Sequence, residues 1–163
     1  MVLQLSPKHL QTMSAHAETT YPEECCGIIL GYLTSEGKTV VEVMPTENAW
    51  NAETAAELPG DDTLDYSKRQ RYAIAPQVML QAQKQARDWA KPTAEGNRKL
   101  NIIGIYHSHT DNPAIPSEYD RQLAWQEYSY IIVSVQNGKA GDIKSWSLDD
   151  NHQFQQEVIE KLG

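Results

Sequence analysis

Residues 100–109 read LNIIGIYHSH, a mostly apolar run that ends abruptly in two histidines two positions apart. The part Leu100–Tyr106 is short and almost continuously apolar, which is typical of a strand buried on both faces. It predicts a central strand that ends at His107-Ser108-His109. Because residues two apart on a strand share a face, the two imidazoles are expected to project side by side.

Other short apolar or β-branched runs predict partners for this strand. Further strands are expected over Cys26–Leu33, Lys38–Met44, Arg71–Ile74, Tyr128–Val135 and Ile143–Leu148. The first two are joined by the turn residues 34–37, and Asn137-Gly138 is a strong turn signal between the last two. The sequence therefore predicts at least two hairpins.

Helical patterns occupy much of the remaining chain. Helices are expected over Ser6–Tyr21, Pro76–Ala90, Ser117–Trp125 and His152–Leu162. Residues 91–99 are expected to form a polar connector. The mixed order of strands and helices predicts a single α/β domain over residues 1–163, with a central mixed β-sheet flanked by helices.

Composition and charge narrow the classes of function. The chain has 163 residues, of which 40% are hydrophobic and 22% charged, and its formal net charge is −8. Nucleic acids and anionic membrane surfaces attract basic proteins, so we expect neither as a partner. No apolar run approaches the roughly 18 residues of a membrane span, and the N-terminus lacks the features of a signal peptide. A cytoplasmic protein is expected.

Residues 47–67 contain six acidic side chains and no lysine or arginine. With Pro59-Gly60 in the middle and little periodicity, they predict a long acidic loop. Long loops in compact domains often act as lids or binding loops.

The two cysteines of the chain, Cys25 and Cys26, are adjacent. They lack the Cys-x-x-Cys spacing of a zinc or redox motif. Both are expected to be reduced, at least partly buried and unreactive.

A chemically distinctive group of residues follows the central strand. After His107 and His109, Ser117-Glu118-Tyr119-Asp120 opens the next predicted helix. Two imidazoles and one carboxylate can form a catalytic zinc site whose fourth position stays open to water. Ser117 and Asp120 also fit a helix capping box, so that segment supports capping and metal binding alike. Such ligands bind other divalent cations too, so the residue types do not fix the metal.

The spacing His-x-His, seven residues, Ser, two residues, Asp resembles the signature of the JAMM (MPN-domain) zinc metalloproteases. His107, His109, Ser117 and Asp120 match every specified position. The family also has an upstream glutamate in a Glu-x-Cys-Gly-like setting, to which Glu24-Cys25-Cys26-Gly27 is similar. The resemblance covers roughly residues 10–134, is weakest over the acidic segment, and implies a JAMM/MPN fold of the cytidine-deaminase-like class.

The resemblance also implies roles for individual residues. His107, His109 and Asp120 would hold one zinc ion per chain, Glu24 would be the general acid/base, and Ser117 would donate a hydrogen bond to the oxyanion. Glu23 is a rival for the base, but strand alternation turns it to the opposite face and favours Glu24.

These roles place a demand on the sheet. Glu24 lies at the start of its strand, whereas His107 and His109 lie at the end of theirs. Their side chains meet only if the two strands run antiparallel. A parallel arrangement would separate them by a strand length, roughly 20 Å at ~3.3 Å per residue.

The family implies hydrolysis of the amide bond after the C-terminal tail of a ubiquitin-like or sulfur-carrier protein, and the chain is similar to its free-standing prokaryotic members. Many relatives have proline where this chain has Thr110, a threonine that some bacterial relatives acting on sulfur carriers share. An extended tail is expected to add to an exposed strand edge near the zinc.

Two alternatives belong to other classes of function. A non-catalytic MPN-type scaffold would bind partner proteins, but such proteins usually lose a ligand or the glutamate. A zinc deaminase needs a His/Cys/Cys ligand set with Pro-Cys-x-x-Cys, which this sequence lacks. The sequence leaves the choice between a monomer and a homodimer open.

Overall fold

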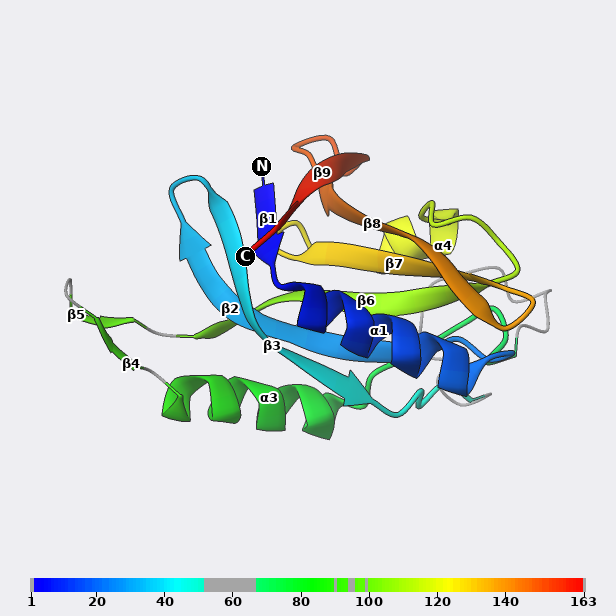
Figure 1. Ribbon diagram of the computed structural model, residues 1–163, viewed down its shortest axis with the longest axis horizontal. Coiled ribbons are helices and arrows are strands. Elements are labelled where there is room, and N and C mark those ends of the chain that lie inside the picture. Colours follow the sequence, from blue (N-terminus) through cyan, green and yellow to red (C-terminus); the bar gives the residue numbers. More distant parts are fainter. Residues whose placement is uncertain (1, 52–66, 90, 94–95, 99, 163) are drawn as a thin grey trace.

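A computed structural model describes residues 2–51, 67–89, 91–93, 96–98 and 100–162 (Figure 1). Most of the predicted acidic loop, residues 52–66, lies outside the described residues. The elements are β1 (Val2–Leu5), α1 (Pro7–Thr20), β2 (Cys26–Thr34), β3 (Gly37–Thr46), α3 (Pro76–Asp88), β4 (Lys91–Thr93), β5 (Gly96–Arg98), β6 (Asn101–Thr110), α4 (Glu118–Leu123), β7 (Ser129–Gln136), β8 (Lys139–Leu148) and β9 (Phe154–Lys161). None of the helices in these ranges is long and apolar enough to cross a membrane.

The main sheet is mixed, as predicted, and closes on itself. Its strand order is β1-β3-β2-β6-β7-β8-β9, and β1 pairs in parallel with both β3 and β9. The central strand β6 pairs antiparallel with β2 and parallel with β7. The sequence indicated neither β1 nor the closure, because the four residues of β1 are too few to show a pattern.

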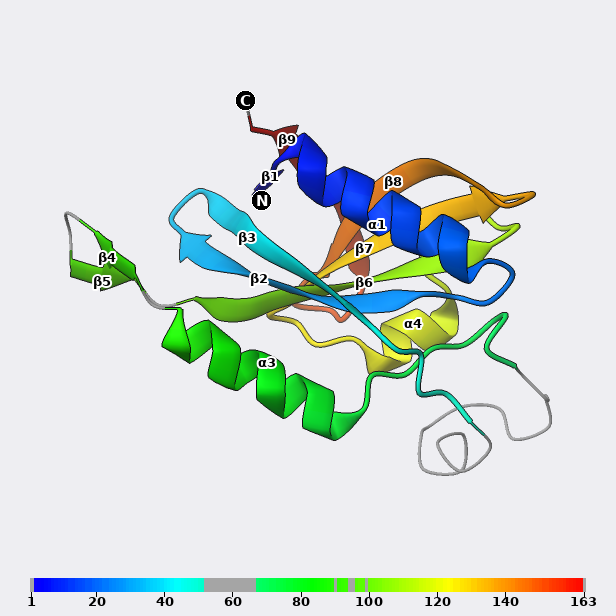
Figure 2. The same ribbon diagram turned by 60° about the horizontal axis from the view of Figure 1, so that its bottom comes forward.

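Helices α1 and α3 cover opposite sides of the sheet (Figure 2). Met13 and Ala17 of α1 join a buried cluster with Ile29 of β2. The next residue on each side, Ile28 and Leu30, belongs to a second cluster with Ala82 and Ala86 of α3. Alternate residues of β2 therefore face different helices. This explains why the predicted strand is continuously apolar, and it confirms burial on both faces.

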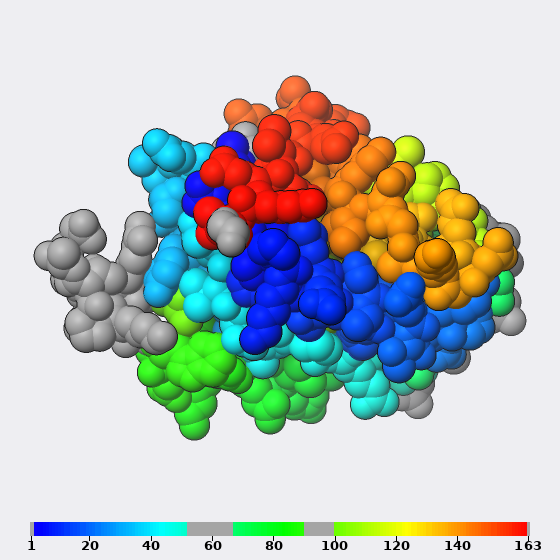
Figure 3. All heavy atoms as spheres, in the orientation of Figure 1, coloured from blue at the N-terminus to red at the C-terminus, as the bar shows by residue number. Residues whose placement is uncertain are grey.

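The predicted C-terminal helix is wrong, because the chain forms β9 over Phe154–Lys161. This strand pairs antiparallel with β8 and parallel with β1, and Figure 3 shows it in red against the blue N-terminal segment. Residues four apart share a face on a strand as well as on a helix, so the spacing of Phe154 and Val158 was ambiguous. In the strand Val158 is 63% exposed, whereas Glu157 is 4% exposed and accepts a hydrogen bond from Ser145 Oγ at 2.9 Å.

Two further expectations need correction. Residues 71–74 form no strand, and their backbone bonds to residues 48 and 49 outside the sheet. Within the expected polar connector, β4 and β5 form a short antiparallel hairpin. The other helices, at 7–20, 76–88 and 118–123, agree with their predicted positions within a few residues.

The register between β2 and β6 determines where the histidines lie. The two strands are antiparallel, which confirms the predicted arrangement, and Cys26 lies opposite His107. At the next position Gly27 lies opposite Tyr106, where an added Cβ would be 2.1 Å from the tyrosine ring. Only glycine lets the strands approach this closely, so the local sequence helps to fix the pairing.

We expect both cysteines to be inert in the folded protein. Cys25 is 1% exposed and Cys26 0% exposed. Burial raises the pKa of Cys25 to about 12 and that of Cys26 to about 11. At pH 8, labelling by an aromatic disulfide reagent should be at least ~100-fold slower in buffer than in denaturant, because thiolate and access are both lost. Rapid labelling of the native protein would contradict this burial.

Candidate metal centre

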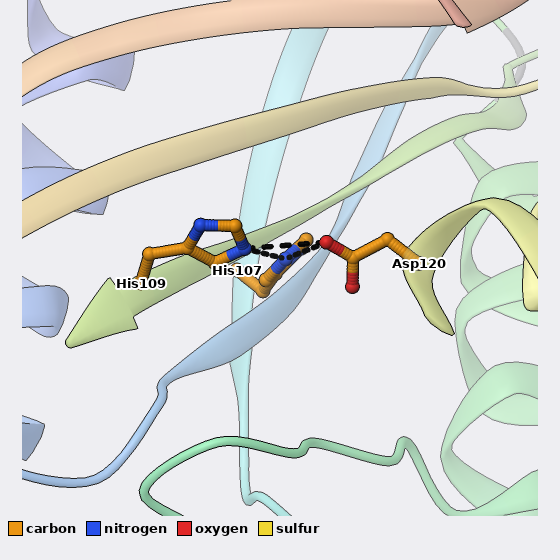
Figure 4. A group of neighbouring side chains, drawn as sticks. All are labelled: His107, His109 and Asp120. Carbon is orange, nitrogen blue, oxygen red and sulfur yellow. Dashed lines mark hydrogen bonds and ion pairs between the residues drawn. The ribbon is translucent and has the colours of Figure 1, made fainter. Parts of the chain in front are cut away.

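Three side chains converge where β6 ends and α4 begins. His107 and His109 extend from β6, and Asp120 faces them from the first turn of α4 (Figure 4). The Nε2 atoms of the two histidines lie 3.2 Å apart, and Asp120 Oδ2 lies 3.2 Å from that of His109 and 3.4 Å from that of His107. Ligand atoms held ~2.0–2.1 Å from a tetrahedral zinc ion are about 3.3–3.4 Å from one another. The spacing of the three atoms therefore fits one such ion.

The hydrogen bonding of His109 also fits a cation. Its Nδ1 lies 2.9 Å from the carbonyl oxygen of Pro113. A carbonyl only accepts, so Nδ1 carries a proton, and the tautomer with its proton on Nδ1 has a lone pair on Nε2, the atom that faces Asp120. Two facing lone pairs repel each other unless a positive charge lies between them. A carbonyl holding the outer nitrogen is also how metal-binding histidines are usually oriented.

Electrostatics keep the other two side chains in the forms that bind metal. Burial lowers the pKa of His107, although the charge of Asp120 opposes this, so its neutral ring is favoured at pH 7. Burial alone would raise the pKa of Asp120, but the two neighbouring imidazoles hold it well below its ordinary value. Two imidazole nitrogens and one carboxylate form a donor set that suits zinc.

The capping box and the candidate ligand coincide. Ser117 Oγ accepts a hydrogen bond from Asp120 N at 3.1 Å, and Ser117 N donates to Asp120 Oδ2 at 2.9 Å. The oxygen that closes the box is therefore the one that faces the histidines. The two interpretations of this segment are compatible, because capping fixes the carboxylate where a metal would need it.

Glu24 lies in the same cleft as these residues. Glu24, His109, Ser117 and Asp120 are among the residues that line an open cavity of about 430 Å³. The side chain of Glu24 is buried, whereas its rival Glu23 is exposed. Burial raises the pKa of Glu24 well above its ordinary value, and the charge of Asp120 adds to this while that of Arg71 opposes it. A raised pKa suits a carboxyl group that takes up and returns a proton near neutral pH.

Two residues of the histidine segment hold the chain around Glu24 in place. Ser108 N donates to Cys25 O at 3.1 Å, and Ser108 Oγ accepts from Cys25 N at 2.8 Å. Thr110 Oγ1 donates to Pro22 O at 2.9 Å. The end of β6 is therefore bonded to residues on both sides of Glu24, which fixes the glutamate relative to the histidines.

Asn48 fixes the other side of Glu24, although no sequence pattern singles it out. Its Nδ2 donates to the carbonyls of Glu24 and Arg71, both at 3.0 Å. Its Oδ1 accepts from the backbone N–H groups of Trp50 at 3.0 Å and Ala73 at 3.2 Å. The buried amide thus joins three chain segments. An isolated asparagine after a strand carries no local signal of such a role.

Tyr72 is a second residue that the sequence did not reveal. Its ring stacks on that of His107, with centroids 4.4 Å apart and planes inclined by 21°. Because Asn48 bonds the backbone on both sides of it, Tyr72 is well placed to fix the orientation of the imidazole.

Comparison with known proteins agrees with this geometry. A family profile described as "Prokaryotic homologs of the JAB domain" matches residues 6–149. The chain belongs to this family. Its membership confirms the resemblance to the JAMM (MPN-domain) proteins that the spacing of His107, His109, Ser117 and Asp120 indicated.

Curated relatives of the chain include a desampylase and a CysO-cysteine peptidase. The chain is 30% identical over 115 residues to the desampylase of Haloferax volcanii, an alignment that covers 69% of this chain and 63% of that enzyme. It is 26% identical over 151 residues to the CysO-cysteine peptidase of Mycobacterium tuberculosis, covering 91% of this chain and 84% of the relative.

Solved structures support the JAB fold over the whole chain. A protein of Desulfitobacterium hafniense is 27% identical with a TM-score of 0.71, covering 98% of this chain and 94% of that one. A JAB1/MPN domain protein from Archaeoglobus fulgidus is 14% identical with a TM-score of 0.51, covering 97% and 99% of the two chains. The second likeness concerns the fold alone.

We expect the purified protein to bind one zinc ion per chain. The variant His109→Ala removes one of three ligands and should lose most of this zinc, whereas His152→Gln, on an exposed turn, should retain it. Elemental analysis measures the metal content. At a free zinc concentration of 100 times Kd, binding should also add about 2.7 kcal/mol to the free energy of unfolding of the wild type. Equal zinc content in both variants would contradict the site.

We expect Asn48→Leu to lower the free energy of unfolding by at least about 2 kcal/mol. The substitution leaves several buried backbone groups without partners, each of which costs roughly 1–3 kcal/mol. Urea denaturation measures the change, and Asn151→Leu, on an exposed turn, is the control with little effect. A stability loss no larger than that of the control would mean that the Asn48 hydrogen bonds are dispensable.

Proposed function

We propose that this JAB-family protein is a zinc-dependent peptidase that hydrolyses the amide bond after the C-terminal tail of a ubiquitin-like or sulfur-carrier protein. The observation that carries the proposal is the convergence of His107, His109 and Asp120 at tetrahedral spacing, with the buried carboxyl group of Glu24 in the same cleft. A desampylase and a CysO-cysteine peptidase among the relatives support the class of substrate.

The metal would be held by His107 Nε2, His109 Nε2 and Asp120 Oδ2. When bound at such a site, zinc supplies a Lewis acid that acidifies water and polarises the scissile carbonyl. Three protein ligands leave one position for this chemistry, as in catalytic rather than structural zinc sites.

Glu24 moves the proton. Its carboxylate takes a proton from the attacking water as the water oxygen bonds to the carbonyl carbon. It then delivers this proton to the leaving nitrogen as the C–N bond breaks. The new carboxyl group of the carrier gives up the second proton of the water to the amine, so the products are a carboxylate and a protonated amine. Burial and the charge of Asp120 raise the pKa of Glu24. A carboxyl group whose pKa is raised toward the working pH exchanges a proton more readily with the water and the leaving nitrogen.

Ser117 stabilises the charge that develops on the carbonyl oxygen. Its hydroxyl oxygen accepts the capping hydrogen bond from Asp120 N, which leaves the hydroxyl hydrogen available. The Ser117 hydroxyl can donate this hydrogen to the oxyanion in the cleft while its oxygen still caps α4.

We expect Glu24→Gln to reduce hydrolysis by about 10²–10⁴-fold while zinc stays bound, because the amide cannot relay a proton and is not a ligand. The assay presents the zinc-loaded protein with a panel of ubiquitin-like carriers extended beyond Gly-Gly and measures product mass with and without a chelator. Glu23→Gln, the exposed neighbour, is the matched control and should cleave like the wild type.

Two outcomes would count against the proposal. Absence of chelator-sensitive cleavage across a broad panel would favour a non-catalytic scaffold. Loss of activity in Glu23→Gln but not in Glu24→Gln would show that Glu23, and not Glu24, transfers the proton.

A further inference from the structure

The two candidate histidine ligands are held in place by different contacts. His109 Nδ1 donates to the carbonyl oxygen of Pro113 at 2.9 Å. His107 is 1% exposed, yet its Nδ1 has no hydrogen-bond partner among the residues that the structure describes. Metal-binding histidines are usually oriented by a hydrogen bond from the outer ring nitrogen. The orientation of the His107 ring therefore depends on some other contact.

The ring of Tyr72 makes that contact. It stacks on the imidazole of His107 with centroids 4.4 Å apart and planes inclined by 21°, so the two rings are nearly parallel. The side-chain torsion that turns a histidine ring has no sharply preferred value of its own. Turning the imidazole about this torsion would drive one ring edge into the face of Tyr72. The stacking thus keeps Nε2 of His107 toward Asp120 Oδ2, which lies 3.4 Å away.

Stacking also favours the metal-bound form of His107. The face of an aromatic ring carries a partial negative charge, which attracts cations and positively polarised groups. An imidazole that donates its Nε2 lone pair to a divalent cation becomes positively polarised. Its attraction to the face of the Tyr72 ring is then stronger than that of the free neutral imidazole. Tyr72 therefore favours metal binding as well as the orientation of one ligand.

Tyr72 is itself held by the scaffold. Asn48 Nδ2 donates to the carbonyl oxygen of Arg71 at 3.0 Å, and Asn48 Oδ1 accepts from the backbone N–H of Ala73 at 3.2 Å. The backbone N–H of Ala49 donates to the carbonyl oxygen of Ala73 at 2.8 Å. These bonds fix the chain on both sides of Tyr72, so its ring is in place before a metal binds.

We propose that Tyr72 is a positioning residue of the metal centre, which orients His107 and raises the affinity for zinc through the face of its ring. The ring face carries this role, and the phenol hydroxyl does not. The inference rests on the proposed function through its metal site alone, because zinc binding is measured without any substrate.

The first test compares the zinc affinity of the full-length wild type with that of Tyr72→Phe and Tyr72→Leu. Competition with a chromophoric chelator of known affinity gives each Kd. Tyr72→Phe keeps the ring face and should bind zinc as tightly as the wild type. Tyr72→Leu fills much of the same space with an apolar side chain but has no ring. It should bind zinc about 10–100-fold more weakly, the usual range when the partner of a metal ligand is removed.

A second readout and a control separate positioning from general stability. Cobalt(II) bound in place of zinc has visible absorption bands that depend on the geometry of its ligands, and these bands should change in Tyr72→Leu but not in Tyr72→Phe. Tyr128→Leu is the matched control, because Tyr128 also stacks on an aromatic ring, that of Trp125, and packs against a cluster that contains no candidate ligand. This control should leave the zinc affinity unchanged. Thermal unfolding of the metal-free variants measures how much stability each substitution costs.

The outcomes separate the role of Tyr72 from that of the site as a whole. If the wild type binds no zinc, the metal centre and this inference both fail. If the wild type binds zinc and Tyr72→Leu binds it as tightly, only the inference is overturned. Equal weakening in Tyr72→Phe would also overturn it, because the hydroxyl and not the ring face would then be responsible. Equal weakening in Tyr128→Leu would overturn it too, because lost stability, and not the orientation of His107, would then lower the affinity. A zinc-loaded wild type that cleaves no carrier would count against the peptidase proposal and leave this inference standing.

Discussion

The antiparallel pairing of β2 with β6 is the constraint on which the site depends. Cys26 lies opposite His107, so the residues just before β2, Glu24 among them, and the last residues of β6 meet at one end of the sheet. A slip of one residue would turn every side chain of β6 to the other face and carry both histidines away from Asp120. Two features disfavour such a slip. Gly27 has no Cβ to clash with the Tyr106 ring that lies opposite it at this register. Ser108 forms two hydrogen bonds with the backbone of Cys25, the residue just before β2.

The residues around the site each serve the fold and the chemistry at once. Asp120 Oδ2 closes the capping box of α4 while facing two imidazoles. Asn48 bonds four backbone groups, in two buried and two partly buried hydrogen bonds, and so fixes the segments that carry Glu24 and Tyr72. Leaving a buried polar group without a partner costs free energy, so these shared hydrogen bonds stabilise the cluster. Among the described residues, His107 Nδ1 and Tyr119 OH are the buried side-chain atoms that lack a hydrogen-bond partner. Because the other hydrogen bonds of the cleft are shared with the scaffold, loss of one of them affects both.

The sequence revealed the parts of this arrangement that have local signals. Each of these signals spans fewer than about twenty residues. They are the apolar runs of β2 and β6, the proline at the start of α1 and the spacing from His107 to Asp120, and the elements lie where these signals predicted them. Contacts between distant segments had no such signal. A spacing of four residues suits a helix and a strand equally. The residues of β9 form a strand because they pair with β1 and β8, and the sequence pattern does not show this pairing. The contacts of Asn48 and Tyr72 join segments more than twenty residues apart, and nothing in their immediate neighbours records them.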